Sequence, residues 1–311
     1  MVKNVLVTGS EGTLGVPLVR LLVEKGYRVT RSDLAHAHGV HRCDVGHLRQ
    51  LEELVEETSP DLVFHLAAEF GRHNGERYYE QLWQTNVIGT RNVLEVQARK
   101  GFKLIMASSS EVYGENVGLT IAEEDFDLRS PRLLNDYAMT KWVNEQQAIN
   151  FERERGSQIM RLRFFNAYGP GERFHSYRSV VALFVGSALL GRPFDVYEGY
   201  RRTFMHVYDF VPTLANAIER FVPGEAINVG GIDYRDVSEL AAIVLKETGA
   251  DEKLARVKKR GEVNVANKLP MIDKAIALLG HDPKIRLEQG VPLTVAWMRA
   301  HLNSMGARAE T

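Results

Sequence analysis

The chain has 311 residues, of which 44% are hydrophobic, so it can bury a substantial core as one large domain or two unequal ones. Thirty-nine Lys and Arg residues against 40 Asp and Glu residues give a formal net charge of −1. This balance excludes a global attraction to nucleic acid or to an anionic membrane surface, so an anionic ligand has to be held by local groups.

Cys43 is the only cysteine, which excludes an internal disulfide framework and suits a reducing compartment. Without a second cysteine or clustered histidines we expect no metal site, and we interpret Cys43 as a buried structural thiol. The N-terminal segment shows no long apolar core or cleavage site, and no hydrophobic run approaches the length of a membrane span. We therefore expect a cytoplasmic protein without membrane or nucleic-acid partners.

The first half of the chain alternates short apolar runs with amphipathic stretches. The apolar runs of strand length are Val5–Val7, Tyr27–Thr30, Leu62–Leu66 and Phe102–Ala107. The amphipathic stretches that follow them are Leu14–Lys25, Leu48–Glu57, Tyr79–Arg99 and Tyr137–Arg155. Such alternation predicts an α/β fold, a Rossmann-like doubly wound parallel sheet whose crossover helices cover both faces.

The second half continues this pattern, with one segment of different amino-acid composition. It predicts strands at Ile159–Phe165 and Ala226–Val229 and helices at 180–190, 209–221, 236–248 and 288–301. Between 166 and 201, Gly, Pro, Arg and aromatic residues are typical of binding loops beyond the carboxyl ends of strands. We divide the chain into a nucleotide-binding domain over 1–166, with a return segment at about 202–232, and a smaller, interleaved substrate-binding domain over 167–201 and 233–311.

A glycine-rich turn separates the first predicted strand from the first predicted helix, and it reads Thr8-Gly9-Ser10-Glu11-Gly12-Thr13-Leu14-Gly15. Gly9 and Gly12 allow backbone amides to approach a pyrophosphate, and Gly15 allows the helix to pack closely on the strand. The helix N-terminus faces the negative charge. The order of strand, turn and helix predicts a dinucleotide site that includes Thr13 and Leu14.

Asp33 follows the second strand about 20 residues on, where a carboxylate accepts bonds from the adenosine ribose hydroxyls and repels a 2′-phosphate. This favours NAD over NADP, although Arg31 lies two residues away, and Asp33 is alternatively a turn or cap residue. Asp44 and Val45, after the third strand, would hold the adenine. Asp44 could equally be the N-cap of a helix over 46–57.

Tyr137 and Lys141 lie four residues apart in a predicted helix, so their side chains share one face. A free phenol has a pKa of about 10, and a neighbouring cation stabilises the phenolate. With the serine cluster at 108–110 as a hydroxyl partner, the pair provides a base for taking hydride from an alcohol carbon. In isolation, such a pair is more often two amphipathic side chains on a surface helix, and the nucleotide motifs favour the catalytic interpretation.

With these motifs in order, the sequence resembles the extended short-chain dehydrogenase/reductases, the NAD-dependent nucleotide-sugar epimerases and dehydratases, whose glycine turn has the form T-G-x-x-G-x-x-G. The resemblance covers nearly the whole chain. Its landmarks are Thr8 to Gly15, Asp44-Val45, His65 to Glu69, Thr85 to Thr90, Ser108 to Gly114, Tyr137 to Lys141, Arg163 to Pro170, Arg202 to Val207 and Asn228 to Gly231.

The resemblance implies NAD as the cofactor, a nucleotide-diphosphate sugar as the substrate, and a homodimer formed through helices around 86–99 and 137–155. It adds four residues to the cofactor site, namely Leu66, Ala67, Ala68 and Asn86. It also implies that Ser109 and Tyr137 bind the substrate O4, with Ser110 beside them.

Four further residues are implied to hold the substrate. Asn166 would contact the sugar nucleotide, and Arg202 would pair with the diphosphate, which agrees with the planar fork that Arg offers to phosphate oxygens. Arg178 and Lys268 are second-rank candidates for the same role. For Arg178 and Arg202 the alternative is a surface ion pair.

The shared opening step of this family would be removal of the O4 proton by Tyr137 while C4 gives hydride to NAD, which leaves a 4-keto sugar. The ketone acidifies the C5 proton and makes a C6 carboxylate a β-keto acid. Glu111, two residues after Ser109, could abstract the C5 proton. It resembles the Ser-Glu pair of GDP-mannose 4,6-dehydratase and UDP-glucuronate decarboxylase, and its alternative role is a capping carboxylate.

Three reactions can follow from that ketone. Ser110 stands where dTDP-glucose dehydratases usually carry Asp, which leaves the acid for departure of the C6 hydroxyl unidentified. Residues His65 to Glu69 resemble dehydratases, whereas decarboxylases tend to carry an arginine in the tail where this chain has Lys268. We rank nucleotide-sugar 4,6-dehydratase first, 4-epimerase second and decarboxylase third.

Two other classes of protein share some of these motifs. An NADPH ketoreductase has the same fold, tyrosine and lysine, and Asp33 argues against it. A non-catalytic NAD-binding protein would not need Ser109, Tyr137 and Lys141 together.

Overall fold

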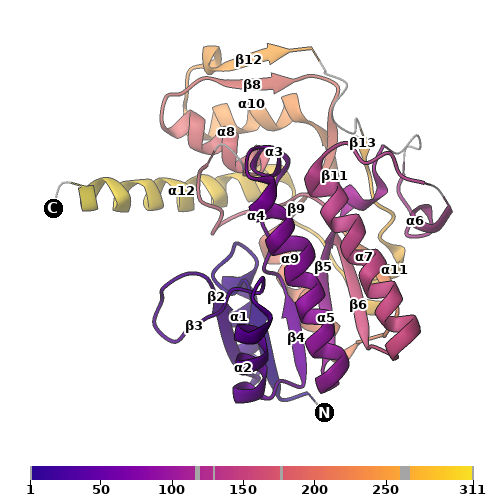
Figure 1. Cartoon of the computed structure of the whole chain (residues 1–311). Helices are drawn as coiled ribbons and strands as arrows, with labels where there is room; N and C mark the ends of the chain where they lie inside the picture. The colour runs from indigo at the N-terminus through magenta and orange to yellow at the C-terminus, as the bar shows by residue number, and fades with distance from the viewer. Residues whose placement is uncertain (1, 116–119, 129, 176–177, 260–266, 310–311) are drawn as a thin grey trace.

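The computed structural model describes residues 2–115, 120–128, 130–175, 178–259 and 267–309 (Figure 1). Its centre is a seven-stranded parallel sheet with the order β10-β6-β5-β4-β1-β2-β3. The strands are β1 (Asn4–Thr8), β2 (Arg28–Asp33), β3 (His41–Arg42), β4 (Leu62–His65), β5 (Lys103–Ser109), β6 (Ile159–Phe164) and β10 (Ala226–Val229). The order reverses direction at β1, as in doubly wound nucleotide-binding folds, so the predicted fold class is confirmed.

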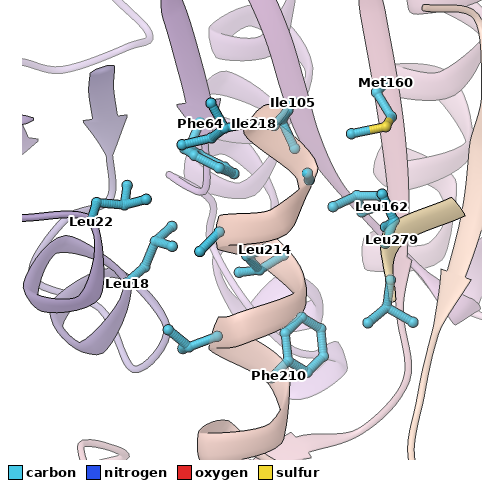
Figure 2. Packing of buried hydrophobic residues seen from close by; sticks show 14 of the residues in the cluster. Leu18, Leu22, Phe64, Ile105, Met160, Leu162, Phe210, Leu214, Ile218 and Leu279 are labelled. Atoms are coloured by element: carbon cyan, nitrogen blue, oxygen red, sulfur yellow. The ribbon is translucent and has the colours of Figure 1, made fainter. Parts of the chain in front are cut away.

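Alternate residues of the strands point to opposite faces of the sheet, and each face has its own hydrophobic core. On one face, Val5 and Val7 of β1 pack with Phe64 against three helices, which are α1 (Gly15–Glu24), α9 (Val207–Glu219) and α11 (Asp273–Leu279). Figure 2 shows Phe210, Leu214 and Ile218 of α9 between Leu18 and Leu22 of α1 and the strand residues Met160 and Leu162.

On the other face, Leu6 and its neighbours pack against a second layer of helices. These are α2 (Leu48–Thr58), α5 (Gly89–Lys100) and α7 (Asp136–Arg155). The predicted helix Tyr79–Arg99 is divided into α4 (Tyr79–Trp83), the π-helical turn η1 (Gln84–Ile88) and α5. Cys43 is free and buried in this layer, as predicted from the sequence.

The remaining elements lie beyond the carboxyl ends of the strands (Figure 1). Helices α8 (Val180–Leu189), α10 (Val237–Thr248) and α12 (Leu287–Ala309) share a third hydrophobic cluster, which includes Tyr168 and Phe204. Smaller sheets join β8 (Phe194–Tyr197) to β12 (Ala255–Lys258), and β9 (Arg201–His206) to β7 (Ala167–Tyr168), β11 (Asp233–Asp236) and β13 (Asn267–Lys268). The short elements are α3 (Arg72–Arg77), η2 (Ser110–Tyr113), α6 (Asp125–Leu128) and η3 (Glu252–Leu254).

The helices predicted in the second half are confirmed, and α12 runs to 309 instead of the predicted 301. Leu302 continues the contacts of α12 with the third cluster, and the end of the helix projects from the body of the molecule (Figure 1). Within the described residues, none of the helices combines the length and apolar composition needed to cross a bilayer. The domain boundaries that we derived from the sequence stay a prediction.

Candidate active site

The glycine turn after β1 packs directly on the segment after β4. A Cβ on Gly9, whose φ is +72°, would lie 2.7 Å from the Ala67 nitrogen, and a Cβ on Gly15 would lie 2.2 Å from the Gly9 carbonyl oxygen. Larger residues would therefore separate α1 from the strands and fill the cradle. Among the described residues, no side chain caps the N-terminus of α1 and its first turn has no acidic residue. These features fit the pyrophosphate of a dinucleotide.

Asp33 ties the glycine turn to the end of β2. Its Oδ2 accepts the Glu11 amide at 3.0 Å and its Oδ1 accepts the Ala35 amide at 3.0 Å. The carboxylate therefore has the structural role of a turn residue and also stands beside the glycine turn, where the ribose of a dinucleotide would lie.

Asp44 and Val45 follow β3, where we predicted the adenine of the dinucleotide. The Asp44 carboxylate accepts the Gly46 amide at 2.8 Å, and Asn92 of α5 donates to the Val45 carbonyl at 2.8 Å. Helix α2 begins at Leu48 with His47 as its N-cap, so Asp44 caps a turn and does not cap the helix.

Asn86 joins the segment after β4 to α7. Its Oδ1 accepts the Glu69 amide at 2.8 Å, and its Nδ2 donates to the Glu69 carbonyl at 3.0 Å and to Thr140 Oγ1 at 3.1 Å. Thr140 precedes Lys141, so Asn86 holds the segment after β4 against α7. In this structure Asn86 therefore positions one wall of the predicted cofactor site.

Tyr137 and Lys141 lie on the buried side of α7. Asn135 is the N-cap of this helix, and its side chain accepts the Ala138 amide at 2.9 Å. The Lys141 ammonium lies 5.9 Å from the Tyr137 ring centroid and donates to the Ala107 carbonyl at 3.0 Å. Burial lowers the pKa of Lys141 to about 8, and Glu145 opposes this shift. Both predicted catalytic side chains therefore face the end of β5.

The Tyr137 hydroxyl is hydrogen-bonded to Ser109, the last residue of β5. Burial raises the pKa of Tyr137 above its ordinary value of 10.0, and the bond to Ser109 opposes this rise without cancelling it. Phe70 packs edge-on against the phenol ring, with 5.8 Å between centroids. In the protein alone the phenol is protonated, so its action as a base requires additional positive charge, which an oxidised nicotinamide carries.

Glu111 lies two residues beyond Ser109, in η2, and its amide donates to Ser109 Oγ at 3.2 Å. Its carboxylate forms an ion pair with Lys268 and is hydrogen-bonded to Asn135. Burial alone would raise the pKa of Glu111, but Lys268, Arg202 and Asn135 together outweigh burial and lower it below 4.5. Glu111 is therefore a carboxylate held directly beside the hydroxyl pair.

The two cations come from adjacent strands of the smaller sheet. Lys268 on β13 and Arg202 on β9 are paired in register, and the Lys268 side chain is only 5% exposed. Arg202 also donates to the Arg201 carbonyl at 2.9 Å and lies over the Tyr200 ring. The sequence suggested Lys268 only as a second-rank phosphate ligand, because a contact across 157 residues leaves no spacing signal.

The other predicted substrate residues are placed differently. Ser110 is buried beside Ser109. Asn166 has a φ of +39° and donates to the Thr203 carbonyl at 3.1 Å, which ties it to β9. Arg178 is exposed before α8, where its amide donates to the His175 carbonyl, and the described contacts do not join it to the Tyr137 cluster.

A buried polar network that the sequence did not reveal lies behind the catalytic residues. Glu145 of α7 is fully buried and accepts Ser108 Oγ at 2.5 Å. It also accepts Arg163 of β6 at 2.9 and 2.7 Å, and Arg163 in turn donates to Tyr113 at 2.8 Å. Because Ser108 precedes Ser109 and Lys141 lies one turn before Glu145, this network fixes β5 and α7 relative to each other. In the described part of the chain, no group of three or more His, Cys, Asp or Glu residues could hold a metal ion.

Comparisons with known proteins agree with this geometry. A family model described as NAD dependent epimerase/dehydratase family matches residues 5–230. The UDP-N-acetyl-alpha-D-glucosaminuronate decarboxylase of Bacillus cytotoxicus is 30% identical, over 96% of this chain and 98% of that protein. The UDP-glucose 4-epimerase of Thermotoga maritima, solved with UDP-glucose, has a TM-score of 0.88 at 29% identity, over 96% of this chain and 99% of that chain. MoeE5 in complex with UDP-glucuronic acid and NAD has a TM-score of 0.84 at 27% identity, with coverages of 96% and 99%.

Proposed function

The chain belongs to the NAD-dependent epimerase/dehydratase family and uses NAD. From this premise we propose that it oxidises a nucleotide-diphosphate hexuronate at C4 and then releases C6 as CO₂. The observation that carries the proposal is the ion pair between Lys268 and Glu111 beside Ser109 and Tyr137. A buried ammonium at this position suits a substrate carboxylate. The relative from Bacillus cytotoxicus supports the same reaction class.

The geometry favours this reaction over the dehydratase that we ranked first from the sequence. Loss of a C6 hydroxyl needs a nearby acid to protonate the leaving oxygen. Ser110 is not an acid, and Lys268 and Arg202 hold Glu111 as a carboxylate. A simple 4-epimerase needs neither a second acid/base group nor a buried cation beside the catalytic hydroxyls.

The reaction would begin at the Tyr137 phenolate, which takes the O4 proton while Ser109 holds O4 by a hydrogen bond. NAD, when bound, accepts the C4 hydride and later returns it. The resulting β-keto acid loses CO₂ when the C5–C6 bond breaks, and its electron pair moves into the enolate at C4 and O4. Lys141 would hold its positive charge near Tyr137 throughout, since its ammonium is fixed by the Ala107 carbonyl.

Glu111 would then supply the proton for C5. In the protein alone its low pKa depends on Lys268. When the substrate carboxylate takes Lys268 as its partner, Glu111 loses that stabilisation and its pKa rises because the group is buried. The ion pair would therefore exchange its carboxylate on substrate binding, and Glu111 would take up a proton from solvent that it later donates to C5. Arg202 stays our proposed partner for the diphosphate.

The test is a product panel. The protein is incubated with UDP-glucuronate, UDP-N-acetylglucosaminuronate, UDP-glucose and dTDP-glucose, and NMR of the products is combined with measurement of released CO₂. We expect CO₂ and a pentose nucleotide from a uronate, with no turnover of the neutral hexoses. A 4-keto-6-deoxy product from a neutral hexose would overturn the proposal in favour of the dehydratase, and a uronate epimer formed without CO₂ would replace it with an epimerase.

We also propose that the chain forms a homodimer through the helices around 86–99 and 137–155. Ile88 and Met139 are 45% and 39% exposed there, and apolar side chains on neighbouring helices suit a helical interface. Light scattering during size-exclusion chromatography should give twice the chain mass, and Ile88→Glu with Met139→Glu should give the monomer mass. A monomeric wild-type protein would contradict this proposal.

A further inference from the structure

The glycine turn contains a charge pair that the catalytic account does not use. Arg31 of β2 donates to Glu11 Oε1 from Nε at 3.2 Å and from Nη2 at 2.7 Å. Ser10 Oγ donates to the same oxygen at 3.1 Å, and Arg31 Nη1 donates to the His38 carbonyl at 3.4 Å. Two acceptors therefore hold the Arg31 guanidinium in place: the Glu11 carboxylate of the glycine turn and the His38 carbonyl of the loop after β2.

This pair lies at the adenosine end of the cofactor site. The Glu11 amide donates to Asp33 Oδ2 at 3.0 Å, so Glu11 contacts the very carboxylate expected to face the ribose. The Arg31 and Glu11 side chains are 32% and 21% exposed, so a bound dinucleotide can reach both. The predicted ribose site therefore has Asp33 and the Arg31–Glu11 pair next to each other.

Arginine at this place has a known physical consequence. In dinucleotide folds a carboxylate after the second strand binds the ribose hydroxyls of NAD, whereas a nearby arginine accommodates the 2′-phosphate of NADP. This chain has both groups. Its selectivity for NAD therefore depends on which anion holds the guanidinium, because an arginine fork already bonded to a carboxylate must break those bonds to bind a phosphate.

We propose that Glu11 is a specificity-determining residue for the cofactor, which excludes NADP by holding Arg31 in an internal ion pair. Asp33 repels the 2′-phosphate, and Glu11 withholds a cation that would compensate for the repulsion. Removal of the Glu11 charge should release Arg31 and expose a latent NADP site. Glu11 and Arg31 contact neither Tyr137 nor the Glu111–Lys268 pair in the described contacts, so this inference stands whichever sugar reaction the protein catalyses.

The experiment measures bound cofactor and does not depend on turnover. The purified protein is equilibrated with mixtures of NAD⁺ and NADP⁺, freed of unbound nucleotide and denatured, and the released dinucleotides are quantified by chromatography. We expect almost only NAD⁺ from the wild type. Glu11→Gln should raise the bound NADP⁺-to-NAD⁺ ratio by about tenfold or more, which corresponds to at least about 1.4 kcal/mol.

The matched variant is Glu11→Gln combined with Arg31→Met. If Glu11 acts through Arg31, the second substitution returns the ratio to within about threefold of the wild-type value. If the gain in NADP⁺ survives without Arg31, Glu11 acts only by direct repulsion and the proposal is wrong. A Glu11→Gln ratio within twofold of the wild type also overturns it. Total dinucleotide bound per chain shows in every sample that the turn is still folded.

Discussion

Two carboxylates lie near the hydroxyls of Ser109 and Tyr137 that we propose to be catalytic, and they are held in different ways. Glu145 is fully buried behind them, and its partners Ser108 and Arg163 come from neighbouring strands of the same sheet. Glu111 lies in front, with 25% of its side chain exposed, and its partner Lys268 comes from a distant strand. A ligand can reach the second pair and cannot reach the first. The same chemical interaction therefore fixes the backbone in one place, and in the proposed reaction it exchanges its partner with the substrate in the other.

The largest effect is expected at the Tyr137 hydroxyl. Tyr137→Phe removes the base while it preserves the ring contact with Phe70, so turnover should fall by about a thousandfold. Bound NAD should stay at the wild-type level, which chromatography of the denatured protein measures. Retention of most of the activity would show that another group takes the O4 proton and would contradict the role proposed for Tyr137.

The difference between the two carboxylates should appear next in stability. Glu145→Gln leaves Arg163 buried without its anionic partner, and loss of one member of a buried pair costs about 3–5 kcal/mol of unfolding free energy. The matched substitution Glu111→Gln should cost less, because a quarter of the Glu111 side chain is exposed and water can reach that end of the pair. Urea unfolding at pH 7 measures both. Equal losses, or a larger loss at Glu111, would contradict the distinction between a fixed and an exchangeable pair.

A smaller effect should appear in acid. Burial acts to raise the pKa of Glu111, but its cationic neighbours lower it below 4.5, so its contribution to stability is fully present above 4.5 and is lost as the pH falls through the folded-state pKa. The difference in melting temperature between the wild type and Glu111→Gln should therefore shrink below pH 4.5. Thermal unfolding followed by circular dichroism between pH 3 and 7 tests this. A difference that is constant over that range would mean that Glu111 is not held as a carboxylate.

The features that were predictable from the sequence are those with local spacing. The turn from Gly9 to Gly15 and the pair Tyr137 and Lys141 each lie within a few residues, so the periodicity of one strand or helix places them. The doubly wound parallel sheet followed from the alternation of apolar and amphipathic segments. All of these depend on backbone geometry that repeats within an element.

The features that the sequence did not reveal depend on contacts between elements. Lys268 meets Glu111 only because β13 pairs with β9, a register that no local pattern encodes. Glu145 has the spacing of an ordinary helix residue, and its burial becomes visible only when Arg163 of β6 lies against α7. The π-helical turn at Gln84–Ile88 interrupts a helix whose apolar periodicity is otherwise continuous.

The central claim is that Lys268 changes its anionic partner from Glu111 to a substrate carboxylate, and its most direct test is binding in the wild type and in Lys268→Met. Isothermal titration of the Tyr137→Phe background with UDP-glucuronate and UDP-glucose measures both affinities without turnover. We predict that UDP-glucuronate binds at least about tenfold more tightly than UDP-glucose, a difference of about 1.4 kcal/mol, and that Lys268→Met abolishes this preference. An equal affinity for the two sugars, or a preference that survives Lys268→Met, would contradict the account.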